Sequence, residues 1–315
     1  MKLNNYAVIK SFSIIVICGA LVALCLPDIF TPLKALIPLF LGIIMFLVGI
    51  NVTLKNMQQI IKIKGRFVVM IVLKSFVIAL IAYMIGRILQ LDSYALIGLV
   101  IVGACPGGTA SNVMSLLSKA NLALTVSLTL VTTLLAPIVM PSILYLFLHK
   151  TVTIPWVGIL TTTFMIVVLP ILAGILFQRY VALKPHTLNR VSLLAIITIV
   201  IVVMIVVALN KEALFHVSLK LCVAVVLLHI LASAVGYLLG KLLNLDHQSA
   251  LALLFEFSIL DVGLGIVIAI LFFGKLAAIA GTLYAVWQNI AGPILVSLLS
   301  GVKQNQMAET VSKFS

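Results

Sequence analysis

The most informative stretch of this sequence is residues 105–112, which read CPGGTASN. It places a proline, two glycines and three polar side chains inside an otherwise apolar segment. A second polar interruption, FEFSILDVG at residues 255–263, begins 150 residues later in a corresponding segment. The hydrocarbon core of a membrane tolerates exposed backbone only where it lines a protein cavity. The two interruptions together therefore predict a binding site near the middle of a membrane.

The composition identifies the class of protein independently. Of the 315 residues, 64% are hydrophobic and only 9% are charged, whereas a water-soluble globular domain is roughly half apolar. A membrane-spanning helix needs about 20 mostly apolar residues. Charged or Pro/Gly-rich joints divide the chain into ten such segments. We predict spans at residues 11–27, 35–51, 67–87, 93–118, 122–148, 153–177, 191–209, 217–240, 249–273 and 276–301.

The net charge of +13 follows a membrane topology and does not indicate a nucleic-acid partner. With the amino terminus in the cytoplasm, thirteen Lys and Arg side chains lie inside and six outside, as the positive-inside rule requires, while Lys74 falls within the third span. Ten spans then divide into two five-helix halves of opposite orientation, typical of an inverted-repeat transporter. We expect residues 1–150 and 151–303 to be the repeats. Residues 304–315 are expected to form a cytoplasmic tail, so both termini are cytoplasmic.

Polar side chains next to the first interruption have the chemistry of cation ligands. The candidates are Thr109, Ser111, Asn112, Thr125 and Thr129. The last two are four residues apart and therefore share a helical face. Hydroxyl and amide oxygens suit a small hard cation. Alternatively, such side chains bond back to their own helix or join neighbouring helices, and this second interpretation is favoured for Thr132 and Thr133.

The second interruption adds negative charge to the predicted site. Glu256 and Asp261 lie near the middle of the ninth span. An unpaired carboxylate at that depth costs at least a few kcal/mol, about 2.5 or more on insertion scales. A cationic partner is therefore expected, and a metal ion, a proton or an internal base could supply it. The alternative is that the two carboxylates only fix helix packing.

Three sequence features together resemble a known family. They are PGGTASN at residues 106–112 in the fourth span, Glu256 followed by Gly263-Leu264 in the ninth, and Trp287-Gln288-Asn289 in the tenth. Over nearly its whole length the chain is similar to the bile acid:sodium symporter (BASS) family. The resemblance implies an all-α fold of ten transmembrane helices in two inverted five-helix repeats. Helices 1, 2, 6 and 7 would form a panel domain, helices 3–5 and 8–10 a core domain, and helices 4 and 9 would be discontinuous and cross.

The resemblance also implies a sodium site. By motif position, its ligands would be Ser111, Asn112, Thr125, Thr129 and Glu256. The family builds a second sodium site with glutamines where this chain has Lys74 and Leu260. We therefore expect one Na⁺ site, with the second lost or replaced by the Lys74 ammonium as a built-in cation. This expectation requires Lys74 to face the core, whereas its long stem could instead extend to the membrane surface.

We expect Thr109, Asp261, Gln288 and Asn289 to face the substrate. Asp261 stands where the family commonly has asparagine, and its carboxylate would repel an anionic substrate unless Lys74 neutralised it. The substrate class therefore stays open among bile acids, pantoate and 2-oxo acids. Gln288 and Asn289 are equally suited to binding an anion or to linking helices.

These features predict cation-coupled, sodium-driven symport of a small organic anion by alternating access, in a bacterial inner membrane and surrounded by lipid. The alternative is a proton-coupled or uncoupled carrier of the same fold, which Lys74 supports. Enzymatic activity is not expected, because the His-Glu-x-x-His motif of a metallohydrolase does not occur. His229 is expected to be a packed structural residue, and the four cysteines are expected to pack without disulfides.

Overall fold

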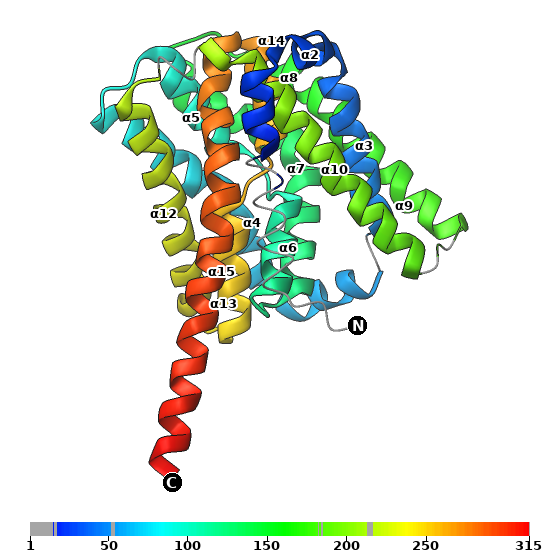
Figure 1. Cartoon of the computed structure of the whole chain (residues 1–315), viewed down its shortest axis with the longest axis vertical. Helices are drawn as coiled ribbons and strands as arrows, with labels where there is room; N and C mark the ends of the chain where they lie inside the picture. Colours follow the sequence, from blue (N-terminus) through cyan, green and yellow to red (C-terminus); the bar gives the residue numbers. More distant parts are fainter. Residues whose placement is uncertain are drawn as a thin grey trace.

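The computed structural model describes residues 15, 18–51, 54–181, 183, 185–212 and 217–314. These residues are almost entirely helical, and an isolated antiparallel bridge joins two of the helix breaks. The all-α class predicted from the composition is therefore confirmed. Figure 1 shows an upright bundle, from the lower end of which the last helix projects.

The helices follow the chain in the order predicted from the apolar segments. Their bounds are α2 Pro27–Phe30, η1 Thr31–Leu36, α3 Ile37–Asn51, α4 Leu54–Ile88, α5 Ser93–Ala104, α6 Thr109–Leu117, α7 Leu122–Leu148, α8 Trp156–Thr163, η2 Phe164–Val168, α9 Leu169–Val181, α10 Pro185–Leu209, α12 Leu219–Leu242, α13 His247–Ser258, α14 Val262–Phe272, η3 Lys275–Ala277 and α15 Ala278–Phe314. Residues 18–25 of the first predicted span are also helical, and that span begins in residues outside the description.

Six of the described helical segments are long and apolar enough to cross a membrane. They are Pro27–Asn51, Val69–Ile88, Leu122–Leu148, Trp156–Val181, Leu219–Leu242 and Lys275–Leu299. The predicted fourth and ninth spans do not qualify as single helices, because each is divided into two shorter ones at a polar interruption. The predicted seventh span lies within α10, of which the apolar part, Leu193–Leu209, is shorter than the six segments above.

Two helices differ from the predicted spans at their ends. Helix α4 begins at Leu54, well before the expected residue 67, and α15 continues to Phe314, beyond the expected residue 301. A helix needs apolar side chains only where it crosses hydrocarbon, so polar residues can extend it into water. Hydropathy therefore locates the membrane-spanning part of these helices and not their ends.

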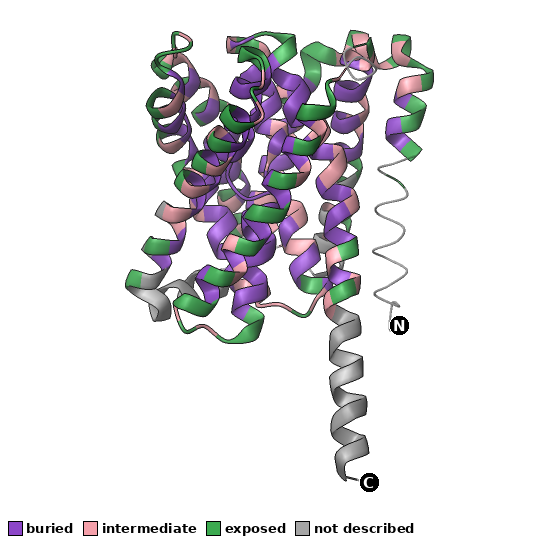
Figure 2. Cartoon of the chain, turned by 90° about the vertical axis from the view of Figure 1, so that its left-hand side faces the viewer, coloured by how far each residue is buried: buried purple, intermediate pink, exposed green. Residues whose placement is uncertain are grey.

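Large apolar side chains remain exposed around the outside of the bundle. Val157, Met165 and Leu193 are 69%, 60% and 58% exposed. Figure 2 shows exposed residues along the outer faces of the helices and buried residues between them. A water-soluble protein rarely leaves so much apolar surface uncovered. This surface is what a helix bundle needs in order to contact lipid.

The helices pack in two groups. Helix α3 packs against α9 and α10, and we call these three the three-helix layer. Helices α4, α5, α7, α12, α13 and α15 pack mainly against one another and form the main bundle (Figure 1). The short helices α6 and α14 belong to the main bundle, and α14 also contacts α3. The two polar interruptions therefore lie where the main bundle faces the three-helix layer.

Candidate functional site

The two helix breaks bind each other through their backbones. The N–H of Gly108 donates to the carbonyl of Ile259 at 2.9 Å, and the N–H of Asp261 donates to the carbonyl of Pro106 at 2.9 Å. Gly107 and Leu260 form the antiparallel bridge between these bonds. Backbone groups released by each break are thereby satisfied inside the protein, as the hydrocarbon environment requires.

The glycines of the first break make room for this contact. A Cβ atom on Gly107 would overlap the Oε1 atom of Glu256, and one on Gly108 would lie 2.7 Å from the carbonyl oxygen of Leu260. Real Cβ atoms do not come this close to other heavy atoms. The CPGGTASN stretch thus allows the second break and the Glu256 carboxylate to approach its backbone directly.

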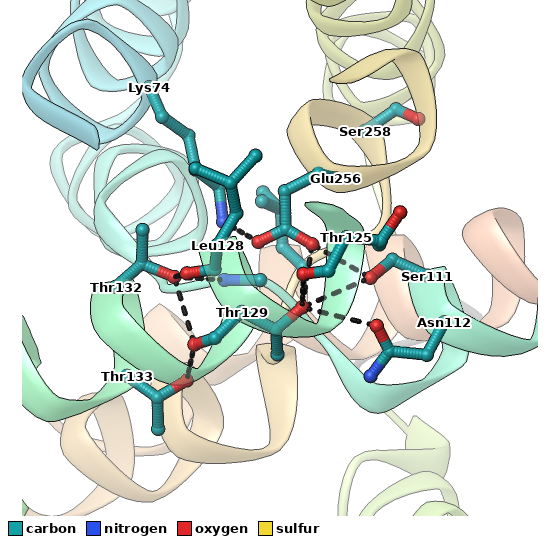
Figure 3. Close-up of polar contacts among 12 residues, drawn as sticks. Lys74, Ser111, Asn112, Thr125, Leu128, Thr129, Thr132, Thr133, Glu256 and Ser258 are labelled. Carbon is teal, nitrogen blue, oxygen red and sulfur yellow. Dashed lines mark hydrogen bonds and ion pairs between the residues drawn. The ribbon is translucent and has the colours of Figure 1, made fainter. Parts of the chain in front are cut away.

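Glu256 is the centre of the polar site. Its side chain is fully buried on α13. One carboxylate oxygen, Oε1, accepts a hydrogen bond from the Lys74 ammonium at 3.0 Å. The other, Oε2, accepts from the Ser111 hydroxyl at 2.9 Å and from the Thr129 hydroxyl at 2.7 Å. Figure 3 shows the ammonium and the hydroxyls at the two oxygens of one carboxylate.

The other predicted cation ligands lie beside this carboxylate (Figure 3). The Oδ1 atom of Asn112 is 3.5 Å from the Thr129 hydroxyl, which also lies 2.9 Å from the carbonyl of Thr125. The Thr125 hydroxyl is 2.8 Å from that of Ser115. Ser115 has the same chemistry as its neighbours but was not predicted; it lies four residues after Ser111 and therefore on the same face of α6.

These contacts converge oxygen atoms from three separate helices. Ser111 and Asn112 come from α6, Thr125 and Thr129 from α7, and Glu256 from α13. Carboxylate, hydroxyl and amide oxygens are ligands of hard cations. The donor set therefore fits a small hard cation such as sodium. We call these five residues the oxygen cluster.

Lys74 faces the core and not the membrane surface. Its side chain is buried on α4, and its ammonium lies on the Glu256 carboxylate. It forms the one ion pair found among the described residues. Of the two directions that the sequence left open, the structure has the inward one. An ammonium therefore occupies one side of the carboxylate and the oxygen cluster the other.

Further side chains hold the breaks open. Gln288 on α15 accepts from the N–H of Leu260 at 2.9 Å and donates to the carbonyl of the same residue at 3.1 Å. The hydroxyl of Tyr284 donates to the carbonyl of Ser258 at 2.8 Å, and the N–H of Gly107 donates to the hydroxyl of Thr132 at 3.4 Å. Gln288 was predicted to face the substrate or link helices. In the structure its amide links α15 to the second break.

A cavity lies between the three-helix layer and the breaks; the space not filled by atoms is about 710 Å³ when the part open to the outside is included. Its walls include apolar side chains of α3 and α10 and polar groups from both breaks. All four predicted substrate-facing residues, Thr109, Asp261, Gln288 and Asn289, line it. The amide of Asn289 also donates to the carbonyl of Ala285 at 2.7 Å. The cavity therefore has an apolar side, formed by α3 and α10, and a polar side, formed by the breaks and α15, which we call its polar floor. The polar floor lies a few residues along the chain from the oxygen cluster.

Comparison with known proteins decides the family. A family model described as the Sodium Bile acid symporter family matches residues 38–217. An uncharacterized sodium-dependent transporter of Bacillus subtilis (strain 168), YocS, is 33% identical over 100% of this chain and 98% of its own length. The chain belongs to the sodium bile acid symporter family. The family predicted from the sequence motifs is thus confirmed.

More distant members of this symporter family align over shorter stretches. The probable sodium/metabolite cotransporter BASS1, chloroplastic, of Arabidopsis thaliana is 29% identical over 93% of this chain and 74% of its own length. The ileal sodium/bile acid cotransporter of Homo sapiens is 23% identical over 71% of this chain and 66% of its own length. Together with the apolar helices, membership of the family identifies an integral, multi-pass membrane protein.

Several other residues singled out in the sequence have structural contacts in this member of the family. The Thr133 hydroxyl donates to the carbonyl of Thr129 at 2.6 Å, and that of Thr132 to the carbonyl of Leu128 at 2.8 Å, which is the back-bonding favoured for both. His229 is 2% exposed and packs against the rings of Tyr284 and Trp287. The four cysteines are free thiols, but the expected packing holds only for part of them: Cys105 is buried and Cys222 partly buried, whereas Cys18 and Cys25 are exposed.

Proposed function

We propose that this protein is a sodium-coupled symporter that moves a small organic anion by alternating access. The oxygen cluster around Glu256 is the observation that carries the proposal. A sodium ion there would be held by the Glu256 carboxylate and the hydroxyls of Ser111 and Thr129, with Asn112 and Thr125 completing its shell. A monovalent cation offsets the charge of a carboxylate that would otherwise be costly in a membrane.

The connection between cluster and cavity supports coupling. Helix α6 carries Ser111 and Asn112 in the cluster and Thr109 at the cavity, and the second break separates Glu256 in the cluster from Asp261 at the cavity. Each break thus touches both sites. A cation bound in the oxygen cluster would order the two breaks and thereby change the affinity of the cavity for substrate. Such a change in affinity is a coupling free energy between the two sites.

The Lys74 ammonium takes the place of a second sodium ion in this proposal. It supplies one fixed positive charge to Glu256, at 3.0 Å. We therefore propose one sodium ion per transport cycle. The same ion pair favours a second candidate function, a proton-coupled or uncoupled carrier, because a carboxylate that already has a cationic partner needs an added ion less.

The complete chain would form ten spans in two inverted repeats, residues 1–150 and 151–303, followed by a tail at residues 304–315. Helices 4 and 9 would cross at the paired breaks. The three-helix layer corresponds to panel helices and the main bundle to the core, so that rocking of one against the other would open the cavity to each side in turn. Cysteine cross-links between α3 and α14 that block transport would support this motion, and unchanged transport would contradict it.

We place the protein in a bacterial inner membrane with both termini in the cytoplasm. The excess of basic side chains on the assigned cytoplasmic side and the similarity to a Bacillus subtilis protein support this assignment. Reporter fusions at the two termini test it, and a signal from an extracytoplasmic reporter at either end would reverse the topology.

Transport in proteoliposomes under separately imposed sodium and proton gradients tests the proposed function. Uptake of candidate anions (bile acids, pantoate and 2-oxo acids) should follow the sodium gradient. Glu256→Gln should abolish sodium-driven uptake, and full activity in this variant would remove Glu256 from the site. Lys74→Gln should change the ion dependence, and an unchanged dependence would exclude the built-in cation. Uptake that follows only the proton gradient would favour the second candidate.

A further inference from the structure

The carboxylate of Asp261 is unusual among the polar groups of the cavity. Asp261 is the N-cap residue of α14, and its Oδ1 atom accepts one long hydrogen bond, 3.4 Å, from the N–H of Leu264. Its Oδ2 atom is enclosed and has no hydrogen-bond partner among the described residues. An ionised carboxylate can accept about four hydrogen bonds, and buried charges are normally paired. This carboxylate therefore has unused capacity to bind a donor.

No side chain of the cavity supplies a positive charge to Asp261. The residues that line the cavity include no lysine, arginine or histidine. Lys74 directs its ammonium to Glu256, at 3.0 Å, and no ion pair of Asp261 occurs in the described part of the chain. Lys74 acts on the Asp261 carboxylate from a distance. In the described part of the chain no cationic group binds that carboxylate directly, so the polar side of the cavity can accept a positively charged group from a bound molecule.

The charges at the two breaks limit what the cavity can accept. If both carboxylates are ionised and Lys74 is protonated, Glu256 and Asp261 contribute two negative charges and Lys74 one positive charge. One sodium ion in the oxygen cluster would bring the sum to zero and leave Asp261 as the charge that faces the cavity. A simple anion would then meet a carboxylate in an environment of low dielectric, where repulsion is strong. A zwitterion would meet a partner and leave the sum unchanged.

We propose that the substrate carries a protonated amine beside its carboxylate, and that Asp261 binds the ammonium. This inference rests on the sodium coupling and the cavity of the proposed function, and it replaces the simple organic anion of that proposal with a small amino acid, a zwitterion that keeps the carboxylate. Rotation of the aspartate carboxylate is soft and exchanges its two oxygens, so either can face the amine. The apolar wall contributed by Leu41, Met45 and Val203 suits an apolar side chain on the substrate.

The opposite end of such a substrate also has a place to bind. Thr109 and Ala110 form the first turn of the nine-residue helix α6 and line the cavity. Backbone N–H groups in a first helical turn have no partner within the helix and attract anions. The substrate carboxylate therefore belongs at the start of α6 and the ammonium at the start of α14, so that each break binds one end of the molecule.

Matched pairs of ligands test the inference. Alanine and pyruvate, and phenylalanine and phenylpyruvate, share a carbon skeleton and a carboxylate and differ in the amine. Binding to the purified full chain is measured by isothermal titration calorimetry at neutral pH with and without sodium, and uptake is measured in proteoliposomes. In each pair the amino acid should bind more tightly, on the order of tenfold, since the oxo acid lacks the charge-assisted bond to Asp261.

The decisive variant is Asp261→Asn, which keeps the size of the side chain and its ability to begin a helix. It should weaken binding of the amino acid on the order of tenfold and tighten binding of the oxo acid, reversing the preference. Asp92→Asn is the matched control, because Asp92 begins α5 in the same way and lies outside the cavity lining. It should leave the preference unchanged.

Each other outcome overturns the inference. The inference is wrong if the parent protein binds the oxo acid as well as or better than the amino acid. It is also wrong if Asp261→Asn keeps the preference of the parent, or if the parent binds neither the amino acids nor the oxo acids. Failure of the proposed function gives a different result, because sodium would then neither stabilise the ligand-free protein nor drive uptake of any ligand. Sodium-driven uptake of an oxo acid alone would therefore keep the symporter and exclude the zwitterion.

Discussion

The two helix breaks reach similar geometry by different means. The first break contains Pro106, Gly107 and Gly108, so its own sequence interrupts the helix. The second break, Ile259-Leu260-Asp261, contains neither proline nor glycine. It is held open from outside, by the amide of Gln288, the hydroxyl of Tyr284 and the backbone of the first break.

The breaks also differ in the charges next to them. The first is followed by neutral ligands, Ser111 and Asn112, whereas the second lies between two carboxylates, Glu256 and Asp261. A break caused by its own proline and glycines keeps its conformation whether or not ions and substrate are bound. A break maintained by contacts with other segments can change its conformation when those contacts change. We therefore expect the first to be a fixed frame and the second to change with occupancy.

The largest effect should come from filling the first break. In Gly107→Ala the new methyl group would overlap Glu256 Oε1 and displace the carboxylate from Lys74, Ser111 and Thr129. Sodium-driven uptake in proteoliposomes should fall to background. Gly65→Ala is the matched control, since no heavy atom lies within 4 Å of its Cβ position on α4. Parent-like uptake in both variants would show that the first break does not frame the site.

The next effect should come from unpairing the charges at Glu256. Removing one partner of a buried ion pair costs about 3–5 kcal/mol, so Glu256→Gln and Lys74→Gln should each lower the melting temperature in detergent. Sodium should restore stability to Lys74→Gln, because the ion can replace the ammonium, but not to Glu256→Gln. The double variant should be more stable than Glu256→Gln alone. Equal sodium responses in the two single variants would contradict the comparison.

Much of the first break could be predicted from the sequence, but less of the second. Proline and paired glycines interrupt a helix by their own chemistry, and Glu256 in an apolar segment requires a cation wherever the chain folds. By contrast, nothing around Leu260 indicates that its backbone binds Gln288, 28 residues later. That contact depends on how α15 packs. The direction of Lys74 was undecided for a similar reason, because a flexible lysine stem permits both directions until its neighbours are known.

A smaller effect should follow from releasing the second break. Gln288→Leu removes two hydrogen bonds to Leu260 and leaves buried backbone groups unsatisfied, at about 1–3 kcal/mol each. Tyr284→Phe removes one bond to the same break and should cost about half as much. Hydrogen exchange of residues 255–263 should become faster in both variants, more so in Gln288→Leu, while exchange at residues 105–112 stays near the parent rate. Equal acceleration of both breaks would mean that they open as one unit.

The smallest effect should come from one neutral ligand beside the first break. Thr129→Val keeps the shape of the side chain but removes the hydroxyl that lies 2.7 Å from Glu256. One such bond to a charged group contributes about 1.5–3 kcal/mol, so the sodium concentration for half-maximal uptake should rise on the order of tenfold or more. Thr133→Val is the matched control, one helical turn away, because the Thr133 hydroxyl donates only to a backbone carbonyl of its own helix. If both variants shift sodium dependence equally, the effect comes from packing of α7 and not from the oxygen cluster. If only Thr129→Val raises the sodium concentration needed, neutral oxygens contribute directly to sodium binding. The ion would then be bound jointly by neutral side chains near the first break and by the Glu256 carboxylate near the second.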